Sequence, residues 1–114
     1  MPVVSPWWTV QHGPGRVVAT AIHDGHEVRS EVAAAIALGD AERMREEDPF
    51  TGQATLDVPI HIVVHGSRFD LDLNRPPEGA VYSTPEESWG LDLWKPGAPG
   101  EALVRTSLDL HDEY

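Results

Sequence analysis

The sequence of 114 residues contains no cysteine, and its 8 Lys and Arg residues are far outnumbered by 19 Asp and Glu residues. Without cysteine, disulfides and thiolate metal sites are excluded. A net charge of −11 repels phosphate backbones and anionic lipid, which makes nucleic acid and membrane surfaces poor candidate partners. No apolar run approaches the roughly 18 residues of a membrane-spanning helix, and no signal-peptide pattern is present. We therefore expect a soluble, cytoplasmic protein.

The pattern of apolar residues indicates one small α/β domain. Expected strands cover residues 17–22, 60–64 and 69–73, and expected helices cover 30–38, 40–47 and the stretch from 101 onward, with a helical turn starting near 84. Residues 1–15 carry no recognisable motif. Because no strand follows the last helix, we expect domain 1–114 to be part of a larger fold. The apolar face of that helix then predicts self-association of the isolated chain.

A histidine-rich turn directly follows the first expected strand. His23, His26 and Glu27 lie around Gly25, at the strand end where α/β folds commonly form ligand sites. Histidine nitrogen and carboxylate oxygen are ligands that zinc accepts, so His23 with His26 or Glu27 has metal-ligand spacing. The alternative is a solvated polar turn.

Two further segments carry groups suited to chemistry. Asp48 stands before a proline, which fixes the backbone, so it could be a metal ligand supplied by a loop; the alternative is a solvated helix end. Strand alternation over 69–73 would place Arg68, Asp70 and Asp72 on one face, followed by Arg75 at the strand end. An arginine there could bind a carboxylate through two hydrogen bonds, or could pair with an aspartate for structure alone.

Taken together, these motifs resemble the N-formylglutamate amidohydrolase family, which is related to the zinc carboxypeptidases and to the aspartoacylase and succinylglutamate desuccinylase group. The resemblance covers roughly residues 16–114, about the first half of a usual member. The Asp-Leu-Asn-Arg element is its most specific part. The matching residues are 22–25, Glu31, 47–48, 67–68 and 72–77.

The resemblance implies a zinc ion and part of its ligand set. His23 would be one ligand and Asp48 the carboxylate ligand, with Glu27 as the alternative carboxylate. The third ligand and the general base would lie beyond residue 114. The other histidines of the second half are not expected to bind metal: His61, His65 and His111.

The resemblance also implies a fold, a substrate and a reaction. The fold is a partial three-layer α/β/α sandwich of the zinc-exopeptidase (phosphorylase/hydrolase-like) type with a mixed sheet. Arg68 would polarise the scissile carbonyl or bind substrate, Asn74 and Arg75 would hold the substrate carboxylate, and Asp72 would orient Arg75. The implied reaction hydrolyses an N-acyl amino acid such as N-formylglutamate to formate and glutamate. The alternatives are a non-catalytic remnant or regulatory module, and a carboxypeptidase or deacylase acting on another acyl group.

Overall fold

The computed structural model describes residues 3–4 and 7–114 and contains a mixed four-stranded sheet. The strands are β1 (Val3–Val4), β2 (Trp8–Gln11), β3 (Val18–Ala21) and β4 (Ile60–Val64), in the spatial order β1-β2-β4-β3. Strand β4 pairs parallel with β3 and antiparallel with β2. The predicted α/β class and mixed sheet are therefore confirmed, and β3 and β4 lie within their predicted ranges.

Strand β2 comes from the N-terminal segment, in which the sequence analysis found no motif. Trp8 lies opposite Val64 in the antiparallel pairing with β4. Just before it, the backbone carbonyl of Trp7 accepts a hydrogen bond from the His65 amide at 2.6 Å. The ring of Trp7 packs so closely on Gly66 that a Cβ at this glycine would lie 1.3 Å from it. The segment thus both widens the sheet and fixes the chain as it leaves β4.

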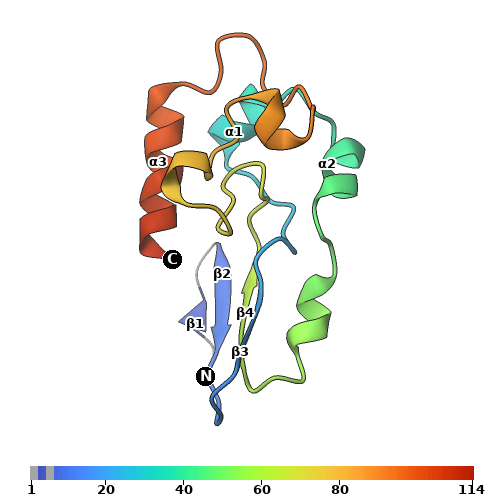
Figure 1. Cartoon of the computed structure of the whole chain (residues 1–114), viewed down its shortest axis with the longest axis vertical. Coiled ribbons are helices and arrows are strands. Elements are labelled where there is room, and N and C mark those ends of the chain that lie inside the picture. Colours follow the sequence, from blue (N-terminus) through green and yellow to red (C-terminus); the bar gives the residue numbers. More distant parts are fainter. Residues whose placement is uncertain (1–2, 5–6) are drawn as a thin grey trace.

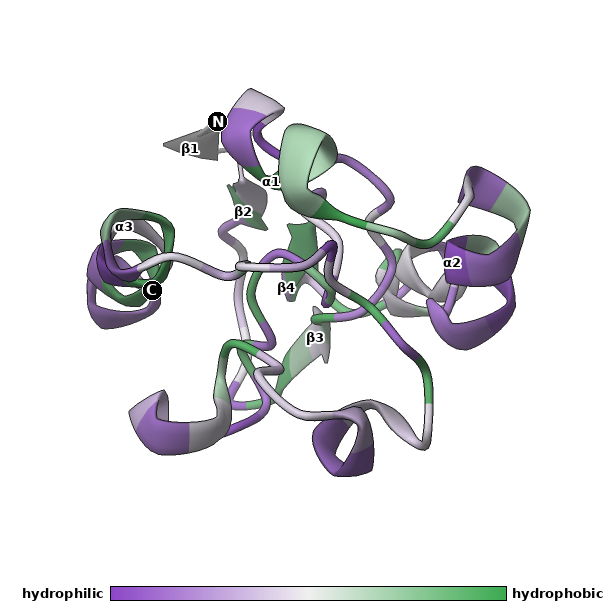
Figure 2. Cartoon of the chain, turned by 90° about the horizontal axis from the view of Figure 1, so that it is seen from above, coloured by the Kyte–Doolittle hydropathy of each residue, from purple (hydrophilic) through white to green (hydrophobic). Residues whose placement is uncertain are grey.

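Within residues 3–4 and 7–114, three α-helices and three short 3-10 helices accompany the strands. They are α1 (Ser30–Ala35), α2 (Asp40–Glu46), α3 (Glu101–Glu113), η1 (Thr51–Thr55), η2 (Pro77–Gly79) and η3 (Pro85–Ser88). Helices α2 and α3 lie on opposite sides of the strands, whereas α1 lies beyond one end of the sheet (Figures 1 and 2). Of the helical segments, η1 packs against β3 and β4. The predicted helix from residue 101 onward is confirmed.

Helix α1 is shorter than predicted, since it stops at Ala35 rather than continuing to Leu38. Ile36 turns to an extended conformation and forms an isolated antiparallel bridge with Trp94. The amide of Ala37 then donates to the Leu93 carbonyl at 2.6 Å. A backbone partner far along the chain therefore outweighs the helix propensity of the alanine run, which local sequence cannot foresee.

The predicted strand over 69–73 is wrong, because this segment forms consecutive turns. The Ser67 carbonyl accepts hydrogen bonds from the amides of Asp70 and Leu71 at 3.0 and 3.2 Å. The Asp72 carboxylate accepts one from the Asn74 amide at 2.9 Å, a local bond by which aspartate favours turns over strands. Consequently Arg68, Asp70 and Asp72 do not share a face by alternation.

The hydrophobic core lies at the end of the molecule where α1 is found. Its buried residues are Val32, Ile36, Phe69, Tyr82 and Leu93. Through this core, the turns of the 69–73 segment pack between α1 and the loops that carry Tyr82 and Leu93. In the part of the chain that the structure describes, no helix has the length and apolar character needed to cross a membrane.

Candidate active site

His23 lies just past the end of β3, between two carboxylates. Its Nε2 lies 2.7 Å from Oδ1 of Asp72, and its Nδ1 lies 3.6 Å from Oδ2 of Asp48. An ionised carboxylate only accepts hydrogen bonds, so Nε2 donates to Asp72, and Nδ1 is the nitrogen that faces Asp48. A histidine held through Nε2 in this way can use its Nδ1 to bind a metal ion or to exchange a proton.

The glycine of the His-x-Gly motif makes this placement possible. A Cβ at Gly25 would lie 2.1 Å from the backbone of His65, so only glycine lets the loop after β3 lie against the exit of β4. The amide of Asp48 donates to the His23 carbonyl at 2.9 Å and joins the second loop to the first. The proximity of His23 and Asp48 therefore follows from the backbone of three loops.

Asp72 is the buried centre of the site, with 1% of its surface exposed. It accepts hydrogen bonds from His23, from the Tyr82 hydroxyl and from the Asn74 amide. Burial alone would raise the pKa of Asp72, but these hydrogen bonds outweigh burial and hold that pKa well below its usual range. Burial and the bond to Asp72 raise the pKa of Tyr82, so its hydroxyl remains a donor.

Two arginines reach the same carboxylate. The Nη2 of Arg68 and the Nε of Arg75 each lie 3.5 Å from Oδ2 of Asp72. Arg68 is further fixed, because it donates to the Tyr82 hydroxyl at 3.0 Å and to the Glu46 carbonyl at 3.1 Å. Among the described residues, the terminal nitrogens of Arg75 have no hydrogen-bond partner. Arg75 can therefore offer two parallel donors to a carboxylate.

The candidate residues Glu27 and Asn74, and His111, stand in different relations to this network. Glu27 is exposed, and its backbone pairs with the chain at Gly66, so the carboxylate that faces His23 is that of Asp48. Asn74 reaches Asp72 through its backbone amide, and its exposed side chain is available to a ligand. His111 donates to the Arg75 carbonyl at 2.7 Å on the side of α3.

The sequence analysis assigned no role to two groups that matter here. Tyr82 gave no signal, because a lone tyrosine ten residues after Asp72 has no characteristic spacing. Glu47 belongs to an acidic run whose alternative interpretation was a solvated helix end, yet Glu47 is buried and accepts hydrogen bonds from His26, Arg43 and Ser67. The sequence distance between Glu47 and Ser67 concealed this cluster.

His23 and Asp48 fit two positions of a metal site. Two ligands of one zinc ion, each about 2 Å from it at a tetrahedral angle, lie about 3.4 Å apart, close to the 3.6 Å between Nδ1 and Oδ2. Within residues 3–4 and 7–114 no group of three or more His, Asp or Glu side chains is arranged to hold a metal ion. The described residues therefore supply a pair of donors.

The candidate site thus brings a histidine and a carboxylate next to two arginines. Comparison with protein families agrees, since the model of N-formylglutamate amidohydrolase matches residues 15–113. The chain belongs to the N-formylglutamate amidohydrolase family, which confirms the resemblance and indicates an amidohydrolase. Neither the curated proteins nor the solved structures gave a match.

Proposed function

We propose that this site serves the zinc-dependent hydrolysis of an N-acyl amide on an acidic amino acid, with N-formylglutamate as the substrate. Water adds across the amide, so that formate and glutamate are released. The observation that carries the proposal is that Nδ1 of His23 faces Asp48 within a network that also holds the terminal nitrogens of Arg75. One site thus combines a place for the reaction with a place for a carboxylate.

His23 and Asp48 would hold the metal, within a fold of the zinc-exopeptidase type. Bound zinc acidifies a water molecule and stabilises negative charge on a carbonyl oxygen. The third ligand and the general base are not among the described residues, so no reaction step is assigned to them. Asp72 contributes by fixing the His23 tautomer and raising the basicity of the ring, as carboxylates behind metal-binding histidines do.

Arg68, Arg75 and Asn74 would bind the substrate. Arg68 lies 3.8 Å from Asp48, so its positive charge is next to the proposed reaction centre and can polarise the acyl carbonyl. Arg75 and the exposed amide of Asn74 would hold the substrate carboxylate. Because the protein carries a net charge of −11, an anion needs such a local positive site to bind at all.

The test is formate release from N-formylglutamate by the purified chain, with added zinc and with a chelator. Turnover that needs zinc and is lost in Arg75→Lys supports the proposal, because a point charge cannot replace a bidentate donor. Arg105→Lys, on the exposed side of α3, is the matched control and should keep the parent rate. Turnover that is unchanged by chelation, or by Arg75→Lys, would contradict the proposal.

A second candidate is a binding module that keeps the family core without catalysis. It is favoured by the absence of a third metal donor around His23 among the described residues. This candidate predicts calorimetric binding of N-formylglutamate, again lost in Arg75→Lys, without any formate release at saturating zinc. Release of another acid from other N-acyl glutamates, but not of formate, would instead indicate a different acyl group.

A further inference from the structure

Trp89 is an exposed aromatic residue in an unusual backbone conformation. Its φ is 55°, in the left-handed region, and 51% of its surface is exposed. Apart from glycines, Phe50 is the other described residue with positive φ. Bulky residues adopt this region at an energetic cost, and such strain persists where the surrounding structure holds it.

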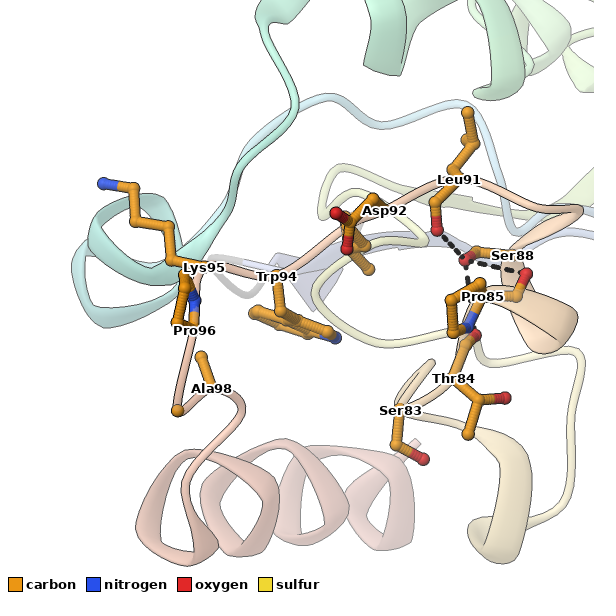
Figure 3. Close-up of a pocket in the computed structure, with 12 residues that line it drawn as sticks. Ser83, Thr84, Pro85, Ser88, Leu91, Asp92, Trp94, Lys95, Pro96 and Ala98 are labelled. Carbon is orange, nitrogen blue, oxygen red and sulfur yellow. Dashed lines mark hydrogen bonds between the residues drawn. The ribbon is translucent and has the colours of Figure 1, made fainter.

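The turn around Trp89 is firmly held by its neighbours. The buried hydroxyl of Ser88 lies 3.0 Å from the Leu91 carbonyl and 3.4 Å from the carbonyls of Thr84 and Pro85, as the dashed lines in Figure 3 show. The Gly90 amide also donates to the Pro85 carbonyl at 2.7 Å. This hydrogen bonding fixes the backbone around Trp89, which follows the last residue of η3.

The indole ring lies against both arginines of the site. The guanidinium carbon of Arg68 is 4.6 Å from the ring centroid, and that of Arg75 is 5.8 Å from it. Arg75 also lies 4.3 Å from the centroid of Tyr82, whose ring packs edge-to-face on Trp89 at 5.7 Å. Two cations are therefore gathered on two aromatic rings.

This arrangement has a consequence for the donors of Arg75. An aromatic face attracts a guanidinium through its quadrupole and leaves the in-plane N–H groups free to bind other partners. The attraction also offsets the repulsion between two like charges held close together. Asp72 lies 3.5 Å from Nε of Arg75, and the rings of Tyr82 and Trp89 lie against the guanidinium carbon that carries its terminal nitrogens.

We infer that Trp89 is a positioning residue that, with Tyr82, holds Arg75 so that its two terminal nitrogens face a substrate carboxylate. The inference rests on the proposed function, because the carboxylate is that of the proposed substrate. It deepens that function by explaining why a strained, exposed tryptophan stands beside the arginines. If Trp89 had only a structural role, we would expect its side chain to be buried or to stabilise the turn at residues 85–91.

The test compares three substitutions of Trp89 by calorimetric titration with N-formylglutamate. Trp89→Leu keeps bulk but removes the aromatic face, and we expect about tenfold weaker binding. Trp89→Phe keeps an aromatic face and should retain most of the affinity. Trp89→Gly should also bind about tenfold more weakly, yet unfold at a midpoint no lower than the parent, because glycine relieves the positive φ.

Two controls separate this inference from the proposed function. Arg75→Lys tests the carboxylate site itself, and parent-like binding by this variant contradicts the proposed function. Loss of binding in Arg75→Lys together with parent-like binding in Trp89→Leu overturns the role of Trp89 alone. Leu56→Ala, which removes an exposed apolar side chain on the η1 side, should bind as the parent does.

A second readout needs no ligand. Arg75 lies over aromatic rings, so its Nε–H resonance in the NMR spectrum should be shifted by ring currents. We expect Trp89→Leu to reduce that shift and Trp89→Phe to preserve much of it, at any concentration of substrate. An unchanged Arg75 resonance in Trp89→Leu would show that the indole does not restrain the guanidinium and would overturn the inference.

Discussion

Asp70 and Asp72 stand two positions apart and are both almost fully buried, yet their surroundings differ completely. Asp70 is paired with Arg29, at 2.9 Å from Nη2, and accepts from the Arg29 amide at 2.9 Å. Ser107 of α3 adds to this cluster. Each of these contacts joins the 69–73 segment to a distant part of the chain, namely the residue before α1 or helix α3. Asp70 therefore joins the entry of α1 to α3.

The neighbours of Asp72 are instead the residues proposed to bind metal and substrate. His23 presents its second nitrogen to Asp48, and Arg75 keeps its terminal nitrogens unpaired among the described residues. A carboxylate whose partners tie separate segments of the fold together serves stability, whereas one whose partners present a donor or a lone pair to a ligand serves binding. The two aspartates thus separate a structural cluster from the proposed functional one.

The largest effect is expected on the structural side of this comparison. Arg29→Ala leaves the Asp70 carboxylate buried without its partner, and we expect the free energy of unfolding to fall by about 3 kcal/mol. Urea unfolding followed by circular dichroism measures the loss. Arg105→Ala, an exposed arginine of α3, should change stability by less than about 0.5 kcal/mol. Equal stabilities for the two variants would contradict a structural role for Asp70.

Asp72→Asn should act mainly on the site. The amide can still occupy the space, but it no longer accepts as a charged group, so the His23 tautomer and the arginines lose their anchor. We expect zinc affinity to fall by about 10- to 100-fold, measured by competition with a chromophoric chelator. Asp70→Asn is the matched control, and its zinc affinity should equal that of the parent. A loss of zinc affinity in Asp70→Asn equal to that in Asp72→Asn would erase the distinction between them.

Tyr82→Phe should have a smaller effect on the same side. It removes the hydroxyl that donates to Asp72 but keeps the ring under Arg75. We expect a loss of about 1 kcal/mol in the free energy of unfolding, typical of one buried hydrogen bond, with carboxylate binding largely kept. Tyr82→Leu, which removes the ring as well, should weaken carboxylate binding in addition.

The sequence predicted the elements that depend on local pattern and missed those that depend on distant partners. Strands β3 and β4 were predicted from their apolar runs, α2 from a polar helical stretch that ends before Pro49, and α3 from its apolar face. The turns at 69–73 were read as a strand, since alternation of apolar and polar residues cannot reveal a carboxylate bonded to its own backbone. Strand β2 was missed for lack of a motif.

The candidate site shows the same limit. The resemblance to the family pointed to His23, Asp48 and Arg75; the structure brings His23 and Arg75 to Asp72, and Asp48 to His23, although their proposed roles stay predictions. Tyr82 and Trp89 complete the surroundings of Arg75 only through loops that the hydrophobic core positions. Sequence spacing carries no information on such contacts, because they depend on how separate loops pack.

The smallest expected effect concerns the second place where α3 is attached. Asp70 holds the middle of the helix through Ser107, whereas its end rests on the edge-to-face contact of Tyr114 with Trp8, with centroids 5.1 Å apart. Burial raises the pKa of Tyr114, so the folded state favours the neutral phenol. This contribution to stability is complete below the ordinary tyrosine pKa of about 10 and is lost as pH rises through the higher folded-state value.

Urea unfolding measured from about pH 9 to about pH 11, a range around the ordinary tyrosine pKa of about 10, should therefore show a free energy of unfolding that falls as pH rises. In Tyr114→Phe the fall should be shallower, with Tyr82 supplying what remains. A parent-like slope in Tyr114→Phe would mean that the end of α3 adds nothing to the attachment made by Asp70.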